Sequence, residues 1–346
     1  MLKIRGLASL IALIGLVAAA CTPAAPAGQV AASPTVTPPA GTVTPAAPAE
    51  VSFTDASGAR LTFNRRVERI VCLAGPCQDM LFELGLMPVA ARGIAKERKY
   101  LLDLFDQYDR VPAISGSFLE PNLEDIAKAQ PDLVIGIGGQ VAAREALRPF
   151  APLWIVGART YRESFENLRI LGRLTGREAQ AEAAIRKTEN KIADYRAKAP
   201  RNERPIVLKM WGTGQTFGID PIESIYGSVL AEVTNYPWRT PPNTPDAGGG
   251  DGRIAYSLEE ILRVNPDVLI IADFDAAFGG PPFTNQFRDN PIWAQITAVK
   301  NNRILMGNVT TYLNTRGSRA FRLMLDEVMP FAYPSIFPQP LPDRER

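Results

Sequence analysis

One segment of the hydrophobic pattern occurs twice along the chain. Residues 122–135 (NLEDIAKAQPDLVI) return 135 positions later as residues 257–270 (SLEEILRVNPDVLI), with six identities over fourteen positions. Each copy opens on a helix-capping residue, continues as an amphipathic helix, turns at Pro-Asp, and ends in an apolar run typical of a strand buried on both faces. Because this spacing is too long for a solenoid repeat, it predicts two similar α/β lobes.

Apolar strand patterns alternate with helical patterns on both sides of the repeat. In the first half, a hairpin-like segment at 53–63 precedes four predicted strands, at 69–73, 88–93, 132–137 and 153–156. Helices are predicted between them, at 79–84, 122–130 and 142–148. The second half repeats the alternation, with strands at 206–211 and 303–306 and helices at 223–233 and 316–329 around the second copy of the repeat. This order favours mostly parallel sheets covered on both faces.

The longest helical pattern lies between the two halves. Apolar residues recur at helical intervals from Tyr161 to Lys198, and Gly172 and Gly176 interrupt them only mildly. We therefore expect one connecting helix at 161–200, between an N-terminal lobe at 51–160 and a C-terminal lobe at 201–340. A Pro- and Gly-rich stretch from Asn235 to Gly252 is expected to be an irregular, flexible loop, since its acids do not alternate as in a calcium loop.

The N-terminus has the pattern of a secretory signal. Lys3 and Arg5 precede an uncharged apolar stretch at 7–20 that is too short to span a bilayer comfortably and ends in Ala-Ala-Ala-Cys. This predicts a lipoprotein signal at 1–21 with the lipid on Cys21, so that acyl chains tether the protein to a membrane. The alternative is an ordinary signal peptide with a coincidental cysteine.

The segment that follows cannot form a packed core. Residues 22–49 contain no charge and no aromatic side chain, and seven of the 28 are prolines. Such a Pro-rich chain extends by about 3.1 Å per residue, or roughly 85 Å when fully stretched. We therefore assign 22–50 to a disordered linker that acts as a leash for the two lobes.

Composition excludes several classes of function. The 346-residue chain has a formal charge of +2 without a basic run, so nucleic acid is not an expected partner. Histidine is absent, which removes the commonest general base and the commonest transition-metal ligand. Residues 136–139 (GIGG) lack the third glycine of a dinucleotide-binding loop. Cys72 and Cys77 are either bridged or two partly buried thiols, of which two thiols are the simpler reading.

These features, taken in order, resemble one family. Signal, linker, the opening at 51–55, the strand RIVCL at 69–73, the helix DMLFELG at 79–85 and the two LE…PD units resemble the substrate-binding lipoproteins of ABC importers for iron-siderophore complexes and vitamin B12. The resemblance covers about residues 51–335. It implies two Rossmann-like lobes joined by one rigid helix, with the ligand in the cleft between them.

The resemblance also gives the repeat a role. In that family, one exposed acidic residue on each lobe contacts arginines of the two permease subunits, and the matching positions are Glu124 and Glu259. A pseudo-symmetric pair of carboxylates suits a two-fold partner. Without the resemblance the helix dipole would explain both acids, because it favours negative charge in a first helical turn.

Candidate ligand contacts follow from the expected fold. Ligands of open α/β lobes lie beyond the carboxyl ends of the strands, where aromatic walls suit a bulky chelate and arginine forks suit carboxylate or catecholate oxygens. Several of these side chains would equally suit a hydrophobic core or an ion pair at the surface. The expected contacts are Pro76, Tyr100, Phe118, Arg159, Trp211, Phe217, Tyr236, Trp238, Phe274, Tyr312 and Arg316.

The sequence thus predicts an extracytoplasmic, lipid-anchored binding protein that captures a ferric siderophore and delivers it to an ABC permease dimer. It is expected to act as a monomer, without a cofactor, a metal site of its own or catalysis, because the chelator supplies the oxygen ligands of ferric iron. A corrinoid binder is the alternative within the same class. A secreted two-lobed enzyme that uses a carboxylate, Lys or Tyr base, and a purely structural surface lipoprotein, are the alternatives outside it.

Overall fold

The N-terminal lobe opens with an antiparallel hairpin. The computed structural model describes residues 50–92, 110–214, 216–247, 251–277 and 279–344. In it, β1 (Val51–Thr54) pairs with β2 (Arg60–Phe63), which confirms the hairpin predicted at 53–63. Asp55 organises the turn, because its carboxylate accepts hydrogen bonds from the backbone N–H groups of Ser57 and Ala59.

The sheet of this lobe is parallel throughout. Its order is β4-β3-β5-β6, and every strand residue is buried. The strands β3 (Ile70–Cys72), β4 (Ala90–Ala91), β5 (Leu133–Gly136) and β6 (Leu153–Ile155) lie inside the predicted segments. The helices are α1 (Gly75–Glu83), α3 (Leu123–Lys128) and α4 (Arg144–Leu147), with a 3₁₀ turn, η2 (Gly138–Ala143), before α4.

The C-terminal lobe has a mixed sheet of order β11-β10-β7-β8-β9. Strands β7 (Val207–Thr213), β10 (Val268–Asp273) and β11 (Ile304–Gly307) are parallel, as predicted. Strands β8 (Thr216–Ile219) and β9 (Ile254–Ala255) are antiparallel and were not predicted, because each is too short to show an alternating pattern. Its helices are α7 (Ile225–Val233), α8 (Leu258–Val264), α9 (Phe274–Ala277), α10 (Pro291–Gln295), α11 (Thr297–Lys300) and α12 (Ser318–Ala332), with a 3₁₀ turn η3 (Phe283–Phe287) and a π turn η4 (Thr310–Asn314).

The repeated segments occupy equivalent places in the two sheets. The first runs from α3 into β5 and the second from α8 into β10, each beside the strand that starts its lobe's sheet. Asp132 accepts from the backbone N–H groups of Glu68 and Arg69, just before β3. Asp267 accepts from Ile206 N–H, just before β7. The Pro-Asp pair that the two copies share therefore has a structural role: the aspartate after the proline hydrogen-bonds to the backbone just before the neighbouring strand.

The connecting segment is two helices, not the single one expected at 161–200. α5 (Tyr161–Thr175) ends at Gly176, which has a φ of +68°, and α6 (Glu178–Lys198) starts two residues later. Glycine adopts this left-handed conformation without steric cost and so ends the helix. A Cβ on Gly172 would lie 2.9 Å from Ala181 Cβ, so this glycine lets α5 and α6 pack closely.

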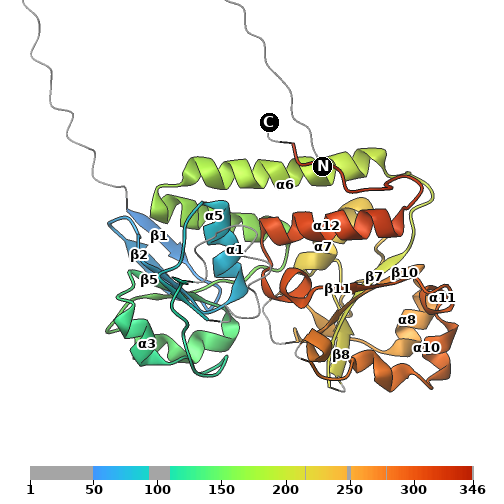
Figure 1. The fold of residues 1–346 in the computed structure, drawn as a ribbon, viewed down its shortest axis with the longest axis horizontal. Coiled ribbons are helices and arrows are strands. Elements are labelled where there is room, and N and C mark those ends of the chain that lie inside the picture. The colour runs from blue at the N-terminus through green and yellow to red at the C-terminus, as the bar shows by residue number, and fades with distance from the viewer. Residues whose placement is uncertain (1–49, 93–109, 215, 248–250, 278, 345–346) are drawn as a thin grey trace, which may run out of the picture. The chain divides into compact units, whose positions relative to one another are not determined.

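The two lobes share one hydrophobic core. The main cluster of buried side chains includes residues from both sheets and from α5, α6, α7 and α12. The long helix α6, roughly 30 Å by its residue count, packs against α1, α7 and α12 (Figure 1). Direct contacts join α1 to the start of α12, where Glu83 accepts from Ser318 and Arg322. A continuous core across both lobes favours a rigid arrangement.

Cys72 and Cys77 form a disulfide, with 5.5 Å between their Cα atoms. The simpler reading of two separate thiols was therefore wrong. The bridge joins the last residue of β3 to the first turn of α1, and both residues are fully buried. α1 begins at Gly75, four residues before the helix predicted at 79–84. Pro76 lies in its first turn, where a missing N–H costs nothing.

Candidate functional site

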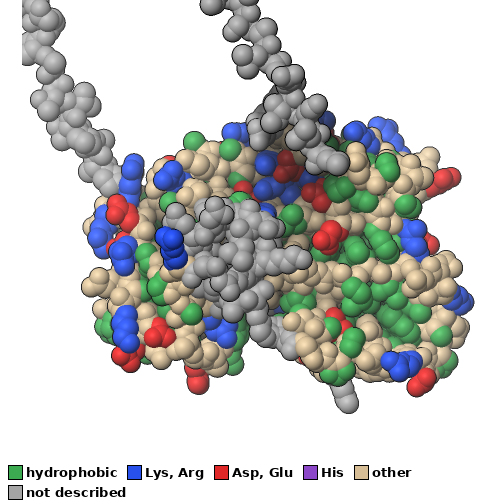
Figure 2. Space-filling view, in the orientation of Figure 1, with side chains coloured by type: hydrophobic (Ala, Val, Ile, Leu, Met, Phe, Trp, Pro, Cys, Tyr) green, Lys and Arg blue, Asp and Glu red, His purple; other side chains and the backbone are tan. Residues whose placement is uncertain are grey.

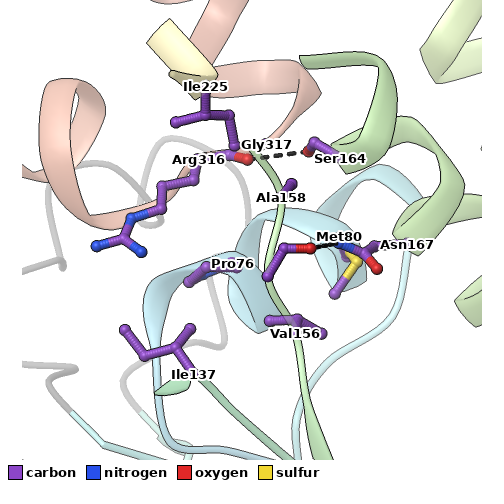
Figure 3. Close-up of a pocket in the computed structure, with 11 residues that line it drawn as sticks. Pro76, Met80, Ile137, Val156, Ala158, Ser164, Asn167, Ile225, Arg316 and Gly317 are labelled. Carbon is purple, nitrogen blue, oxygen red and sulfur yellow. Dashed lines mark hydrogen bonds between the residues drawn. The ribbon is translucent and has the colours of Figure 1, made fainter. Parts of the chain in front are cut away.

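A pocket lies where the N-terminal lobe meets the connecting helices and the segment before α12. One wall follows the carboxyl ends of β3, β5 and β6 and is apolar: Pro76, Ile137, Val156 and Ala158. Across from it stand Ile225 of α7, Ser164 of α5, Arg316 and Gly317 (Figure 3). This is the position at which open α/β lobes bind ligands, so the pocket is the candidate site.

Arg316 is the charged residue that lines this pocket, and its backbone is strained. Its φ is +52°, in the left-handed region that residues with a Cβ rarely adopt. Its N–H donates to Tyr226 Oη at 3.1 Å and its carbonyl accepts from Ser164 Oγ at 2.9 Å. Its Nε donates to the carbonyl of Leu313 at 2.9 Å. Strain held by this many contacts makes Arg316 a candidate functional residue.

Asp251 joins Arg316 to a second arginine. Asp251 Oδ2 lies 2.7 Å from Arg253 Nε and 3.2 Å from Arg316 Nη2. The Asp251 side chain is 1% exposed, and those of Arg253 and Arg316 are 12% and 10% exposed. Burial alone would raise the pKa of Asp251, but the two guanidinium groups outweigh it and lower that pKa below its ordinary value. The carboxylate therefore stays charged between the two cations.

An aromatic residue and a buried ion pair support this cluster from behind. The Arg253 guanidinium lies over the Trp211 ring, 5.2 Å from the ring centroid. Lys209 Nζ contacts Asp220 Oδ2 at 2.6 Å, and both side chains are fully buried. Burial lowers the pKa of Lys209 and raises that of Asp220, while their mutual attraction opposes both changes. Tyr226, which receives the Arg316 N–H, covers Lys209 with its ring at 4.6 Å.

An apolar rim continues the N-terminal wall of the pocket. Phe118 and Leu119 are exposed to 39% and 59%, and the guanidinium of Arg92 lies 5.4 Å from the Phe118 ring centroid. Gln140 connects this rim to the pocket, because its side chain donates to the carbonyl of Phe118 and accepts from Ile137 N–H. The site thus has an apolar side on the N-terminal lobe and a charged side on the C-terminal lobe.

Comparison with known proteins decides the family. The family model described as "Periplasmic binding protein" matches residues 70–307, which span both lobes and the connecting helices. The chain belongs to the periplasmic binding protein family. The match confirms the family resemblance and the α/β fold read from the sequence.

Curated relatives cover most of this binding protein. It is 26% identical over 278 residues to the Fe(3+) dicitrate-binding periplasmic protein FecB of Escherichia coli strain K12, covering 78% of this chain and 87% of FecB. It is 27% identical over 256 residues to the petrobactin-binding protein YclQ of Bacillus subtilis, covering 72% of this chain and 78% of YclQ.

Solved structures show the same fold. The crystal structure of YclQ from Bacillus subtilis superposes with a TM-score of 0.67 at 22% identity, over 82% of this chain and 99% of that one. The structure of SirA from Staphylococcus aureus, complexed with staphyloferrin B, gives a TM-score of 0.65 at 19% identity, over 81% and 97% of the two chains.

The predicted ligand contacts of the binding protein fall into four groups. Pro76 and Arg316 line the pocket, Trp211 supports the arginine cluster, and Phe118 forms the apolar rim. Three others do not line the pocket: Arg159 is exposed and its side chain forms no hydrogen bond or ion pair with a described residue, Phe217 packs on Phe287 with 4.8 Å between ring centroids, and Phe274 is 36% exposed. Tyr100 and the lipidation residue Cys21 lie outside the described residues.

Three expected contacts lie inside the C-terminal lobe instead of on a cleft wall. Trp238 is 1% exposed and donates to the carbonyl of Val207, and Tyr236 donates to the carbonyl of Asp220. Tyr312 is fully buried and donates to Glu327 at 2.6 Å. Each aromatic ring fills the core while its polar atom finds a protein acceptor, which is how buried Tyr and Trp are accommodated.

Asp251 and Arg253 are the residues that the sequence reading missed. The stretch around them is rich in glycine, and that composition pointed to flexibility. Asp251 is instead buried, and Gly252 takes a φ of +81° with its backbone packed against Glu223. The available signal was the charged triplet Asp251-Gly252-Arg253 directly before β9, although β9 itself was too short to predict.

The two carboxylates expected to contact a permease lie at equivalent helix starts. Asn122 caps α3 by accepting from Glu124 and Asp125 N–H, and Ser257 caps α8 by accepting from Glu260 N–H. Glu124 and Glu259 are both exposed. Glu124 pairs with Lys128 at 3.0 Å, a surface pair of little energetic weight.

Charged side chains of both signs are interspersed over the face shown in Figure 2. Across the described ranges, no group of three or more His, Cys, Asp or Glu residues could hold a metal ion. No helix within those ranges has the length and hydropathy required to cross a membrane.

Proposed function

We propose that this protein is an extracytoplasmic binding protein that captures a ferric siderophore and hands it to an ABC importer. The observation that carries the proposal is the family match over both lobes, and the arginine held in a strained conformation opposite an apolar wall at the lobe junction agrees with it. The named ligands of its relatives, ferric dicitrate and petrobactin, support the same class of cargo. Iron is cargo in this proposal, and the chelator supplies its oxygen ligands.

A corrinoid is the weaker candidate for the same pocket. A corrin macrocycle would favour a cleft lined by aromatic rings more than by arginines. Three of the aromatic residues expected there are buried in the core, whereas two arginines meet beside the pocket. The balance of side chains therefore supports an iron chelate.

The proposal includes a membrane anchor and a permease. A lipid on Cys21 and the leash at 22–50 would keep the protein near the membrane, and Glu124 and Glu259 would contact the two subunits of the permease dimer. The protein would act as a monomer and as a carrier, not as an enzyme: its pocket pairs an arginine with apolar side chains and offers no histidine base.

A titration tests the binding function directly. Purified protein is mixed with ferric citrate, ferric tris(2,3-dihydroxybenzoate), ferrioxamine B or cyanocobalamin, and tryptophan fluorescence is followed, with free N-acetyltryptophanamide as the control for light absorption by the ligand. Trp211 is expected to report binding because it packs against Arg253. At least one ferric chelate should give saturable quenching with a Kd of about 1 μM or below. Quenching by none of them, or by cyanocobalamin alone, would refute the proposal.

A further inference from the structure

The arginine cluster beside the pocket is built around one oxygen atom. Asp251 Oδ2 receives both Arg253 Nε and Arg316 Nη2. Two like charges repel, and the carboxylate between them offsets that repulsion, so it stabilises the two guanidinium groups side by side. Asp251 is itself held in place, since Gly252 N–H donates to Asp246 and Ile225 N–H donates to the carbonyl of Asp251.

Arg253 retains donors that the described protein does not use. Its Nε binds Asp251, and its terminal nitrogens make no hydrogen bond to any described residue, although its side chain is only 12% exposed. Its face is fixed by Trp211, with 5.2 Å between guanidinium carbon and ring centroid. Asp251 orients the Arg253 guanidinium through Nε, and Trp211 packs on its flat face. The two terminal nitrogens then form a planar fork of donors, which matches the oxygens of a carboxylate or catecholate.

Arg316 is fixed even more completely, through its backbone as well as its side chain. Tyr226, Ser164 and Leu313 hydrogen-bond to it, and Asp251 forms an ion pair with it. Ser164 belongs to the connecting helix α5 and the other three to the C-terminal lobe. The two arginines are thus placed before any ligand arrives. Preorganised donors bind more tightly because little side-chain entropy is lost on binding.

We propose that Asp251 is a positioning residue that holds Arg253 and Arg316 as one anion-binding fork, and that this fork selects chelates with negatively charged oxygens. The inference rests on the proposed function and narrows its ligand to anionic ferric complexes. The apolar rim at Phe118 and Leu119 would then receive the hydrocarbon part of the same ligand.

Two possible roles of Asp251, as a negative charge and as a residue that positions the two arginines, predict opposite effects of Asp251→Asn on anion binding. If Asp251 acted only by its charge, its removal would leave more positive charge and strengthen the binding of an anion. If it positions the arginines, the same change weakens that binding. We expect ferric citrate or ferric tris(2,3-dihydroxybenzoate), whichever the wild type binds more tightly, to bind at least tenfold more weakly to Asp251→Asn and to Arg253→Met.

Matched variants separate this role from general damage. Arg239→Met removes an arginine of the same lobe that pairs with Glu223 at the surface, and should change affinity less than twofold. In an Arg253→Met background, Asp251→Asn should cost less than it does alone, because part of its effect acts through Arg253. Thermal melts identify any variant that is not folded, and if Asp251→Asn is one of them, Arg253→Met carries the test.

The outcomes distinguish this inference from the function on which it rests. The wild type should prefer the two anionic chelates to the cationic ferrioxamine B by at least a hundredfold. A preference for ferrioxamine B, or an Arg253→Met variant with unchanged affinity, would overturn the anionic fork while leaving the binding function intact. Failure to bind any of the three chelates would overturn both.

Discussion

At the scale of single residues, the contact between the two lobes requires a glycine, Gly317, at a point where there is no room for a side chain. Gly317 follows the strained Arg316 and precedes α12, with an ordinary extended backbone. A Cβ at this position would lie 1.9 Å from Asp79 Oδ1, on α1 of the other lobe. Asp79 is 1% exposed and its other carboxylate oxygen accepts from Ala320 N–H, so it cannot easily move.

Gly317→Ala should therefore destabilise the protein although its backbone conformation suits alanine. We expect a loss of about 1–3 kcal/mol in the free energy of unfolding, the usual range for overpacking. Urea unfolding followed by circular dichroism measures it. Gly138→Ala is the control, since nothing lies within 4 Å of a Cβ there, and it should change stability by less than about 0.5 kcal/mol. Equal effects of the two substitutions would contradict the close approach.

At the scale of elements, two devices join the periphery of the N-terminal lobe to its sheet. The first is Asp55, whose Oδ2 accepts from Ile155 N–H of β6 and from Arg144 Nη2 of α4. It therefore ties the β1–β2 hairpin to the sheet. Burial alone would raise the pKa of Asp55, but hydrogen bonds from Ile155, Ser57 and Arg144 outweigh it and lower that pKa below its ordinary value of 3.8.

The stabilisation by Asp55 should depend on pH in one direction. Because its pKa is lower in the folded than in the unfolded chain, the contribution is complete above about pH 5 and is lost as the pH falls through the folded value. Asp55→Asn should lower the free energy of unfolding by about 1–3 kcal/mol at pH 7. Urea unfolding of both proteins from pH 3 to pH 7 should show this gap shrinking below about pH 4. A gap that widens in acid would argue against a charged Asp55.

The second device is the disulfide between β3 and α1. It encloses Pro76, so it also holds part of the pocket wall. With a sequence separation of 5, loop closure predicts a contribution of about 2 kcal/mol. The double variant Cys72→Ala/Cys77→Ala should lose that amount in urea unfolding. Dithiothreitol should bring the wild-type midpoint close to that of the variant and leave the variant unchanged. A wild-type midpoint that is insensitive to the reductant would show that the bridge contributes nothing.

At the scale of the whole molecule, the two lobes share a hydrophobic core and carry two matching acidic positions. The core continues through α5, α6, α7 and α12, so the lobes are not independent. Glu124 and Glu259 stand at equivalent helix starts, one on each lobe. A partner with two-fold symmetry could contact both at once, and charge pairs across such an interface fix its orientation.

Charge reversal at both positions should separate delivery from binding. Glu124→Lys/Glu259→Lys is expected to abolish uptake of iron chelate by cells that depend on this protein, while affinity in the fluorescence titration stays within twofold of wild type. Glu166→Lys/Glu203→Lys reverses two exposed acids away from these helix starts and should leave uptake intact. A large loss of affinity in the first variant would show that these carboxylates serve the ligand site instead.

Much of the architecture could be predicted because its signals are local. Asn122 and Ser257 cap their helices with their own side chains, and the Pro-Asp turn that follows each helix ties its strand to the neighbouring one. Buried parallel strands need continuous apolar runs, and those runs are visible in the chain. The two lobes and their main strands therefore followed from pattern alone.

What the tertiary structure alone decided depends on contacts between distant segments. The burial of Trp238 and Tyr312 in the core results from such packing, which no local pattern encodes. The helix break at Gly176 and the bridge between Cys72 and Cys77 are local in sequence, but the spacing of residues alone did not decide either of them. The meeting of Arg253 and Arg316 on Asp251 is the clearest case, because 63 residues separate the two arginines. The sequence by itself determined the elements and their order, since these depend on neighbouring residues. The chemistry of the site was decided only by the tertiary structure, because the fold brings charges together that are distant in the sequence.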